Sequence, residues 1–444
     1  MHRDTRPRLR PRERDAIIQS LRAGVTPRTG LQHIQVGRAR EVESLLKDIE
    51  RIADGGSAFR LVIGEFGSGK SFFLQLIRAI ALEKGLVTLH ADLAPDRRLH
   101  ATGGQARNLY AELLRNCSTR TKQDGNALTS VVERFITEAR KEVDVRGGNV
   151  GTAIEERLSS LSELVGGYDF AKVIEAYWQG HESGNDQLKA DAVRWLRGEF
   201  TTKTDARNAL GVRTIVDDAS VYDHFKLLSL FVRQAGYAGL LINLDEMVNL
   251  YKLSSQKART SNYEQILRML NDCLQGSAKY IGFLLGGTPD FLLDPRKGLY
   301  SYEALQSRLA ENSFARAAGV IDYSSPSLHL ASLTPEELLI LLRNLRHVFA
   351  YGDESTYLVP DEALTSFLAH CSQRIGDAYF RTPRNTIKAF VDLLSVLEQG
   401  AGVQWNQLIS QVHVDTEGNT DMPDVPILCD EDDGADDSLA TFRL

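Results

Sequence analysis

The chain has 444 residues, of which 43% are hydrophobic and 25% charged, with a formal net charge of -7, a composition typical of a globular protein of two or three domains. It contains no apolar run of the roughly 20 residues that a membrane-spanning helix requires, and its arginine-rich start lacks the apolar stretch of a signal peptide. Its four cysteines are scattered without CxxC spacing. We therefore expect no disulfide framework, zinc site or membrane association, and a location in a reducing bacterial cytoplasm.

The two ends of the chain carry opposite charge. Residues 1–30 form a basic segment whose first half contains Arg3, Arg6, Arg8, Arg10, Arg12 and Arg14. Residues 413–444 form a tail with ten carboxylates and a single arginine, Arg443. Each end can be a solvated, disordered segment. The alternative is nucleic-acid contact at the basic end and partner binding at the acidic end.

Residues 31–93 predict the first part of an α/β core. Val36-Gly37-Arg38 is followed by a helical pattern, and Phe59–Ile63 is an apolar run suited to a buried parallel strand. Residues 64–71 then read GEFGSGKS, which fits the P-loop pattern GxxxxGK[ST] in every fixed position. A helix from Lys70 to Lys84 would direct the positive end of its dipole toward a phosphate bound at this loop.

The P-loop residues have separate chemical tasks. The glycines let the backbone curl so that successive N–H groups point at phosphate oxygens. Lys70 would reach the β- and γ-phosphates of ATP, and the Ser71 hydroxyl would coordinate Mg²⁺. The expected nucleotide contacts of the loop are Gly64, Glu65, Phe66, Gly67, Ser68, Gly69, Lys70, Ser71 and Phe72.

A second apolar run, residues 239–247, reads GLLINLDEM and resembles a Walker B strand. Asp245 at its end would bind Mg²⁺ through water, and Glu246 would orient or activate the attacking water. Small-molecule kinases with P-loops often lack such an adjacent acidic pair. The pair therefore favours an ATPase over a kinase.

Three further runs complete a predicted parallel sheet. They are Leu86–Leu93, an apolar run from Tyr280 that ends in Gly-Gly-Thr, and Ser327–Leu333. Thr288 lies at a strand tip from which it can touch the γ-phosphate or the water. Strands that alternate with helices place a ligand at their carboxyl ends.

The remaining segments are helical. Residues 94–238 predict a large α-helical insertion between the two parts of the core, 31–93 and 239–333. Residues 334–412 predict a helical lid, whose first helix has proline and two glutamates at its start. We expect ordered structure to end near Val412, where the acidic tail begins.

The chain resembles AAA+ ATPases, because the Val-Gly-Arg element, the Walker A and B pair and a helical lid occur in that order. It is most similar to the ATP-binding proteins of bacteriophage-exclusion (BREX) type anti-phage islands, which usually lie beside helicases. The segments LRAGVTPRTGLQHIQVGR, ADLAPDRRLHATGGQARNLYAELLR and GTPDFLLDPRKGLYSYEALQSRLA carry this second resemblance. The fold class implied is an α/β P-loop NTPase of the AAA+ type.

The resemblance also implies roles for individual residues. Val36, Gly37 and Arg38 would contact the adenine side of the nucleotide, Thr288 would be the first sensor and Arg384 the second. Arg308 would be an arginine finger that acts on a neighbouring subunit, with Arg296 and Arg316 as alternatives. The sequence departs from origin-binding initiators, since no winged-helix DNA reader follows the lid.

Two functions remain open at this stage. The first is a Mg²⁺-dependent, oligomeric ATPase that moves or remodels DNA or a helicase partner in phage defence. The second is an ATP-controlled assembly switch or signalling scaffold with slow turnover.

Overall fold

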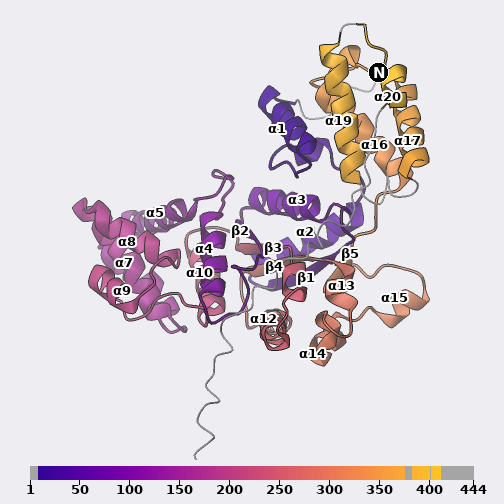
Figure 1. Cartoon of the computed structure of the whole chain (residues 1–444). Helices are drawn as coiled ribbons and strands as arrows, with labels where there is room; N and C mark the ends of the chain where they lie inside the picture. Colours follow the sequence, from indigo (N-terminus) through magenta and orange to yellow (C-terminus); the bar gives the residue numbers. More distant parts are fainter. Residues whose placement is uncertain (1–8, 376–382, 401, 412–444) are drawn as a thin grey trace, which may run out of the picture.

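The computed structural model describes residues 9–375, 383–400 and 402–411 (Figure 1). Its centre is a five-stranded sheet in the order β2-β3-β4-β1-β5, with every adjacent pair parallel. The strands are β1 (Ser57–Ile63), β2 (Val87–Asp92), β3 (Leu240–Asp245), β4 (Ile281–Gly287) and β5 (Ser327–His329). The five predicted strands are present, and the last is shorter than its apolar run suggested.

Helices cover both faces of the sheet because its strands are apolar on both faces. On β1, Phe59, Leu61 and Ile63 pack on one side and Ala58 and Val62 on the other. The second side is covered by α2 (Ala39–Ala53) and α3 (Lys70–Glu83). The first is covered by α4 (Gln105–Arg115), α10 (Val221–Gln234) and α12 (Gln256–Leu274). Figure 1 shows α3 and α12 on opposite sides of the strands.

The segment predicted as one insertion has two parts. Its first and last helices, α4 and α10, pack on the sheet, whereas the helices between them extend sideways as an arm (Figure 1). These are α5 (Leu128–Arg146), α6 (Val150–Ser162), α7 (Gly167–Ser183), α8 (Asp186–Leu196) and α9 (Lys203–Leu210). The arm shares one apolar core with the sheet. Phe231 of α10 packs against Phe135 and Phe170 of the arm, with ring centroids 5.0 and 5.4 Å apart and the ring planes inclined to each other.

Short helices follow the strands that carry the predicted site residues. α11 (Val248–Tyr251) comes after β3, and α13 (Pro289–Leu293), α14 (Glu303–Leu309) and α15 (Ser313–Ala317) come between β4 and β5. Within the described residues, single turns of 3₁₀ helix lie at Leu31–His33, Leu299–Ser301 and Glu354–Thr356.

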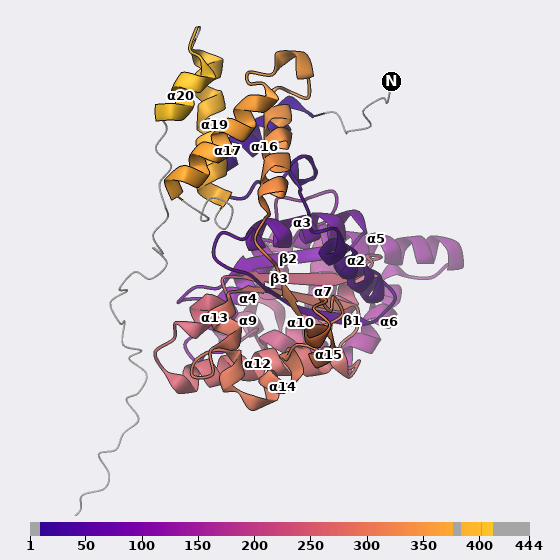
Figure 2. The same ribbon diagram turned by 90° about the vertical axis from the view of Figure 1, so that its right-hand side faces the viewer.

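The lid stands above the α3 side of the core (Figure 2). It contains α16 (Pro335–Phe349), α17 (Asp361–Ile375), α19 (Pro383–Gln399) and α20 (Trp405–Gln411). The predicted start of the first lid helix is present, because Thr334 and Glu337 form a capping box and Pro335 opens α16. In the described part of the chain, no helix is both long enough and apolar enough to span a bilayer.

The N-terminal helix α1 (Pro11–Arg22) belongs to the lid. Ile17 and Ile18 are buried in the lid's apolar core. The Arg14 guanidinium lies 4.5 Å from the ring centroid of Phe349 and pairs with Glu398 at 3.1 Å. The basic segment thus contributes a packed lid helix in its described part. Arg3, Arg6 and Arg8, and the acidic tail at 413–444, lie outside the described residues.

We predict that Ile17→Ala lowers the free energy of unfolding of the lid by about 2–5 kcal/mol, because it leaves a cavity between α1 and the lid helices. Ile17 has 0% exposed surface. Gln19→Ala, at an exposed position of the same helix, is the control and should change the value little. Chemical denaturation measures both, and equal stability of the two variants would contradict the packing role of α1.

Candidate functional site

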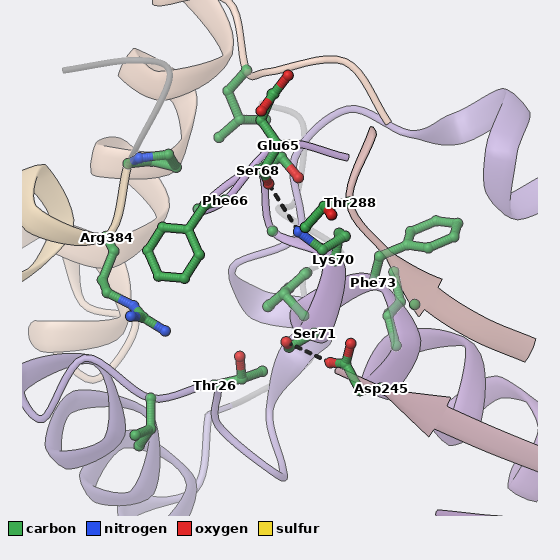
Figure 3. A pocket seen from close by; sticks show the side chains of 18 of the residues that line it. Thr26, Glu65, Phe66, Ser68, Lys70, Ser71, Phe73, Asp245, Thr288 and Arg384 are labelled. Atoms are coloured by element: carbon green, nitrogen blue, oxygen red, sulfur yellow. Dashed lines mark hydrogen bonds between the residues drawn. The ribbon is translucent and has the colours of Figure 1, made fainter. Parts of the chain in front are cut away.

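A cavity of about 330 Å³ lies between the carboxyl ends of the central strands and the lid (Figure 3). The P-loop, the tips of β3 and β4, the segment after α1 and the lid all contribute to its wall. Its polar and charged lining includes Thr26, Arg38, Glu65, Ser68, Lys70, Ser71, Asp245, Glu246, Lys252, Thr288, Asp290 and Arg384. Its volume is within the usual range for small-molecule sites.

The P-loop connects β1 to the first turn of α3. Gly67 and Gly69 have φ values of 77° and 86°, which few other residues adopt. A Cβ at Gly64 would lie 2.4 Å from the Ser68 hydroxyl, so a larger residue there would have to displace the Ser68 side chain. The Lys70 ammonium group donates to the carbonyl oxygens of Gly64 and Glu65, at 2.9 Å each. The lysine is thereby directed along the loop (Figure 3).

The two predicted metal ligands meet. The Ser71 hydroxyl at the start of α3 donates to Asp245 Oδ2 at the end of β3, over 2.7 Å (Figure 3). A Cβ at Gly286 of β4 would lie only 2.5 Å from Asp245 Oδ1, so the missing side chain leaves space for the carboxylate. A hydroxyl and a carboxylate are hard oxygen donors, the type that Mg²⁺ prefers. The arrangement fits Mg²⁺.

Glu246 and Thr288 line the same cavity. Glu246 has the left-handed φ of 58°, and its backbone N–H donates to Asp245 Oδ1 at 2.9 Å. Thr288 is the N-cap of α13, where its hydroxyl accepts the Phe291 N–H at 3.3 Å. Both residues therefore lie at the carboxyl ends of the strands, beside the P-loop.

Asp92 is an acidic neighbour of this site that sequence reasoning missed. It ends β2 and is paired in register with Asp245 of β3. Burial of its carboxyl group and the nearby Asp245 charge raise the pKa of Asp92 above its ordinary value. The signal was available, since Asp92 is an acidic residue close to the end of a predicted strand, as Asp245 is.

The lid side of the cavity contains Arg384, at the start of α19. Its guanidinium lies 5.6 Å from the centroid of the P-loop ring of Phe66 (Figure 3). Its side chain also passes Gly24, and residues 25–27 line the cavity beside it. The second-sensor prediction thus falls on a residue in the cavity wall. The wall formed by residues 24–27 was not predicted, because no motif marks it.

The Val-Gly-Arg element lies at the same wall, although only two of its residues line the cavity. Val36 and Arg38 do so, whereas Gly37 packs against Glu337 of the lid. Phe72 also lines it. The predicted nucleotide contacts, which run from Val36 to Phe72 in the sequence, thus line one cavity with the exception of Gly37 and Gly64.

The arginine-finger candidates lie outside this wall. On α14, the Arg308 Nε donates to Asn271 Oδ1 and its Nη1 donates to the Ala304 carbonyl, both at 2.8 Å. Arg316 pairs with Glu311 at 2.9 Å. Neither these arginines nor Arg296 line the cavity of their own chain.

Comparison with known families decides the identity. The model of the BREX system ATP-binding protein BrxC/D matches residues 9–413. The chain belongs to this family. A comparison with curated proteins finds no match. The predicted resemblance to BREX ATP-binding proteins is therefore confirmed, and with it an ATP-binding role in anti-phage defence.

The cavity suits the nucleotide of a BREX ATP-binding protein. The P-loop and Lys70 would hold the phosphates, and Ser71 and Asp245 would hold the metal. Apolar side chains supply the rest of the wall: Leu21, Val25, Pro27, Ile34, Val36, Leu333, Leu341 and Ile387. Such a wall suits the face of a base.

We predict that Gly286→Ala weakens Mg²⁺ binding in the presence of an ATP analogue by about 10–100-fold, because the new Cβ displaces the Asp245 carboxylate. A titration of Mg²⁺ against the fluorescence of a labelled ATP analogue measures this. Gly282→Ala is a matched control on the same strand, since its Cβ would meet Ile52 at 2.4 Å, away from the site. An unchanged Mg²⁺ midpoint in Gly286→Ala would contradict the assignment.

Proposed function

We propose that this BREX protein is a Mg²⁺-dependent ATPase of the AAA+ type. The observation that carries the proposal is the Ser71–Asp245 hydrogen bond of 2.7 Å, with Glu246 next in the chain. It joins the helix that follows the P-loop to the strand that ends in the acidic pair. A protein that only bound ATP would not need a second carboxylate at this point.

The side chains suggest a division of labour. Lys70 and the P-loop amides would bind the β- and γ-phosphates. Glu246 would accept a proton from the attacking water, and Thr288 would orient that water or the γ-phosphate. Bound Mg²⁺ would neutralise charge on the phosphate oxygens. Arg384 would add a positive charge from the lid.

The strand order supports the AAA+ type. β4 lies between the P-loop strand β1 and the acidic strand β3. Thr288, which follows β4, therefore comes between the P-loop and Asp245, as a first sensor requires. The lid that follows β5 supplies Arg384 to the same cavity.

Glu246→Gln tests the chemistry. It keeps the shape of the side chain but removes the base, so ATP turnover should fall on the order of a hundredfold or more while ATP still binds. Lys70→Ala should instead abolish ATP binding, because the phosphates lose their cationic partner. Steady-state phosphate release and equilibrium binding of a labelled ATP measure the two effects. Glu264→Gln, at an exposed position of α12, is the control. Near-normal turnover in Glu246→Gln would exclude Glu246 as the base.

We also propose that the protein works as a homo-oligomeric motor or remodeller in the cytoplasm, acting on DNA or on a helicase partner. Arg308 is the residue that we propose to act across the subunit boundary, because its side chain lies outside the cavity of its own chain. An ATP-controlled switch with slow turnover is the second candidate. The contact of the lid residue Arg384 with Phe66 of the P-loop favours it, because occupancy of the loop would then bias the lid.

A mixing experiment tests the neighbour's contribution. Arg308→Ala and Glu246→Gln subunits should each be inactive alone, yet mixed oligomers should recover part of the ATPase activity. Some interfaces would then pair an intact Glu246 with an intact Arg308 from the next subunit. Mixing with Arg296→Ala or Arg316→Ala subunits tests the two alternatives. Absence of recovery in oligomers proven to be mixed would count against Arg308.

A further inference from the structure

The chain passes from the core into the lid through a short linker, residues 330–334, between β5 and α16. The Leu330 N–H at its start donates to the carbonyl oxygen of Ile63, the last residue of the P-loop strand, at 2.7 Å. Thr334 at its end caps α16. Any change in the angle between lid and core must be absorbed here or at the N-terminal crossing near Arg38.

Arg38 lies where these two crossings meet the P-loop. Its Nη2 donates to the Ala331 carbonyl in the linker and lies 3.5 Å from the Ser68 carbonyl in the P-loop. Its Nη1 lies 3.6 Å from the Glu41 carboxylate, and each of these two side chains is 12% exposed. One largely buried guanidinium thus contacts both the phosphate-binding loop and the lid linker.

The residue before it touches the lid directly. A Cβ at Gly37 would lie 2.4 Å from Glu337 Oε1, so a larger residue there would have to displace the Glu337 carboxylate. Glu337 is itself part of the α16 cap, because its carboxylate accepts the Thr334 N–H at 2.9 Å. Gly37 and Arg38 have φ values of 64° each, and this turn points the arginine side chain toward the linker while the glycine backbone lies against α16.

We propose that Arg38 is a positioning residue that couples nucleotide occupancy of the P-loop to the angle of the lid. Phosphate binding draws the P-loop amides inward, and the Ser68 carbonyl belongs to one of those peptide groups. A planar guanidinium holds its acceptors in fixed directions, so a shift at Ser68 is passed to Ala331. This role rests on the proposed ATP site and differs from a contact with the adenine base.

Hydrogen exchange of the full chain, with and without Mg²⁺ and a non-hydrolysable ATP analogue, tests the coupling. In the unmodified protein, the analogue should protect amides of the P-loop and change exchange at residues 330–334. In Arg38→Ala, at an analogue concentration raised until the variant is saturated, the P-loop should still gain protection, whereas the response of the linker should be lost. Arg40→Ala, an exposed arginine two positions later, should behave as the unmodified protein.

Every other result contradicts either the coupling or the proposed ATP site. A linker response retained in Arg38→Ala overturns the coupling, and so does loss of both responses, which would make Arg38 a plain nucleotide contact. Arg38→Lys keeps the charge but not the planar fork, so a full linker response in that variant also counts against the proposal. A linker that does not respond in the unmodified protein overturns it too. If the P-loop itself gains no protection there, the proposed ATP site fails instead.

Discussion

The parallel register of β1, β4 and β3 is the constraint on which the site depends. Parallel neighbours end at the same edge of a sheet, so the P-loop after β1, Thr288 after β4 and Asp245 at the end of β3 are brought together. Ser71 and Asp245, which form a hydrogen bond there, are 174 residues apart in the sequence. Two glycines near the end of β4 keep that edge open. Gly286 leaves space for the Asp245 carboxylate, and Gly287 for the Phe291 ring. Packing at the strand tips therefore also sets the position of the Asp245 carboxylate in the cavity.

Polar contacts join the lid to the core, and the lid has an apolar core of its own. Its apolar core is separate from those of the two sheet faces and includes α1, which comes from the opposite end of the sequence. Such a module can tilt as a unit, because few of its apolar contacts extend into the core. The cavity lies where the two bodies meet, so a nucleotide that binds there would touch both.

Local sequence patterns predicted the strands and the position of the cavity-lining residues better than the packing of the helices. The spacing of the P-loop and the Asp245-Glu246 pair reflects backbone geometry within a few residues, and the five strands followed from apolar runs between glycine-rich turns. The docking of α1 on the lid could not be predicted, since an amphipathic pattern such as that around Ile17 shows that a face is buried but not against what. Residues 24–27 were missed for a related reason. They reach the site through folding rather than through a motif.

The backbone at Glu246 has a consequence for how this protein can change. A non-glycine residue at a φ of 58° carries strain of about 1–2 kcal/mol, which glycine would not. Replacement by glycine would therefore relax the fold while it removed the carboxylate. Under the proposed role of Glu246 in ATP hydrolysis, selection for stability alone would favour a more stable protein that no longer hydrolyses ATP. Retention of glutamate at this position in a lineage would accordingly be a sign that turnover, and not mere persistence of the fold, is under selection.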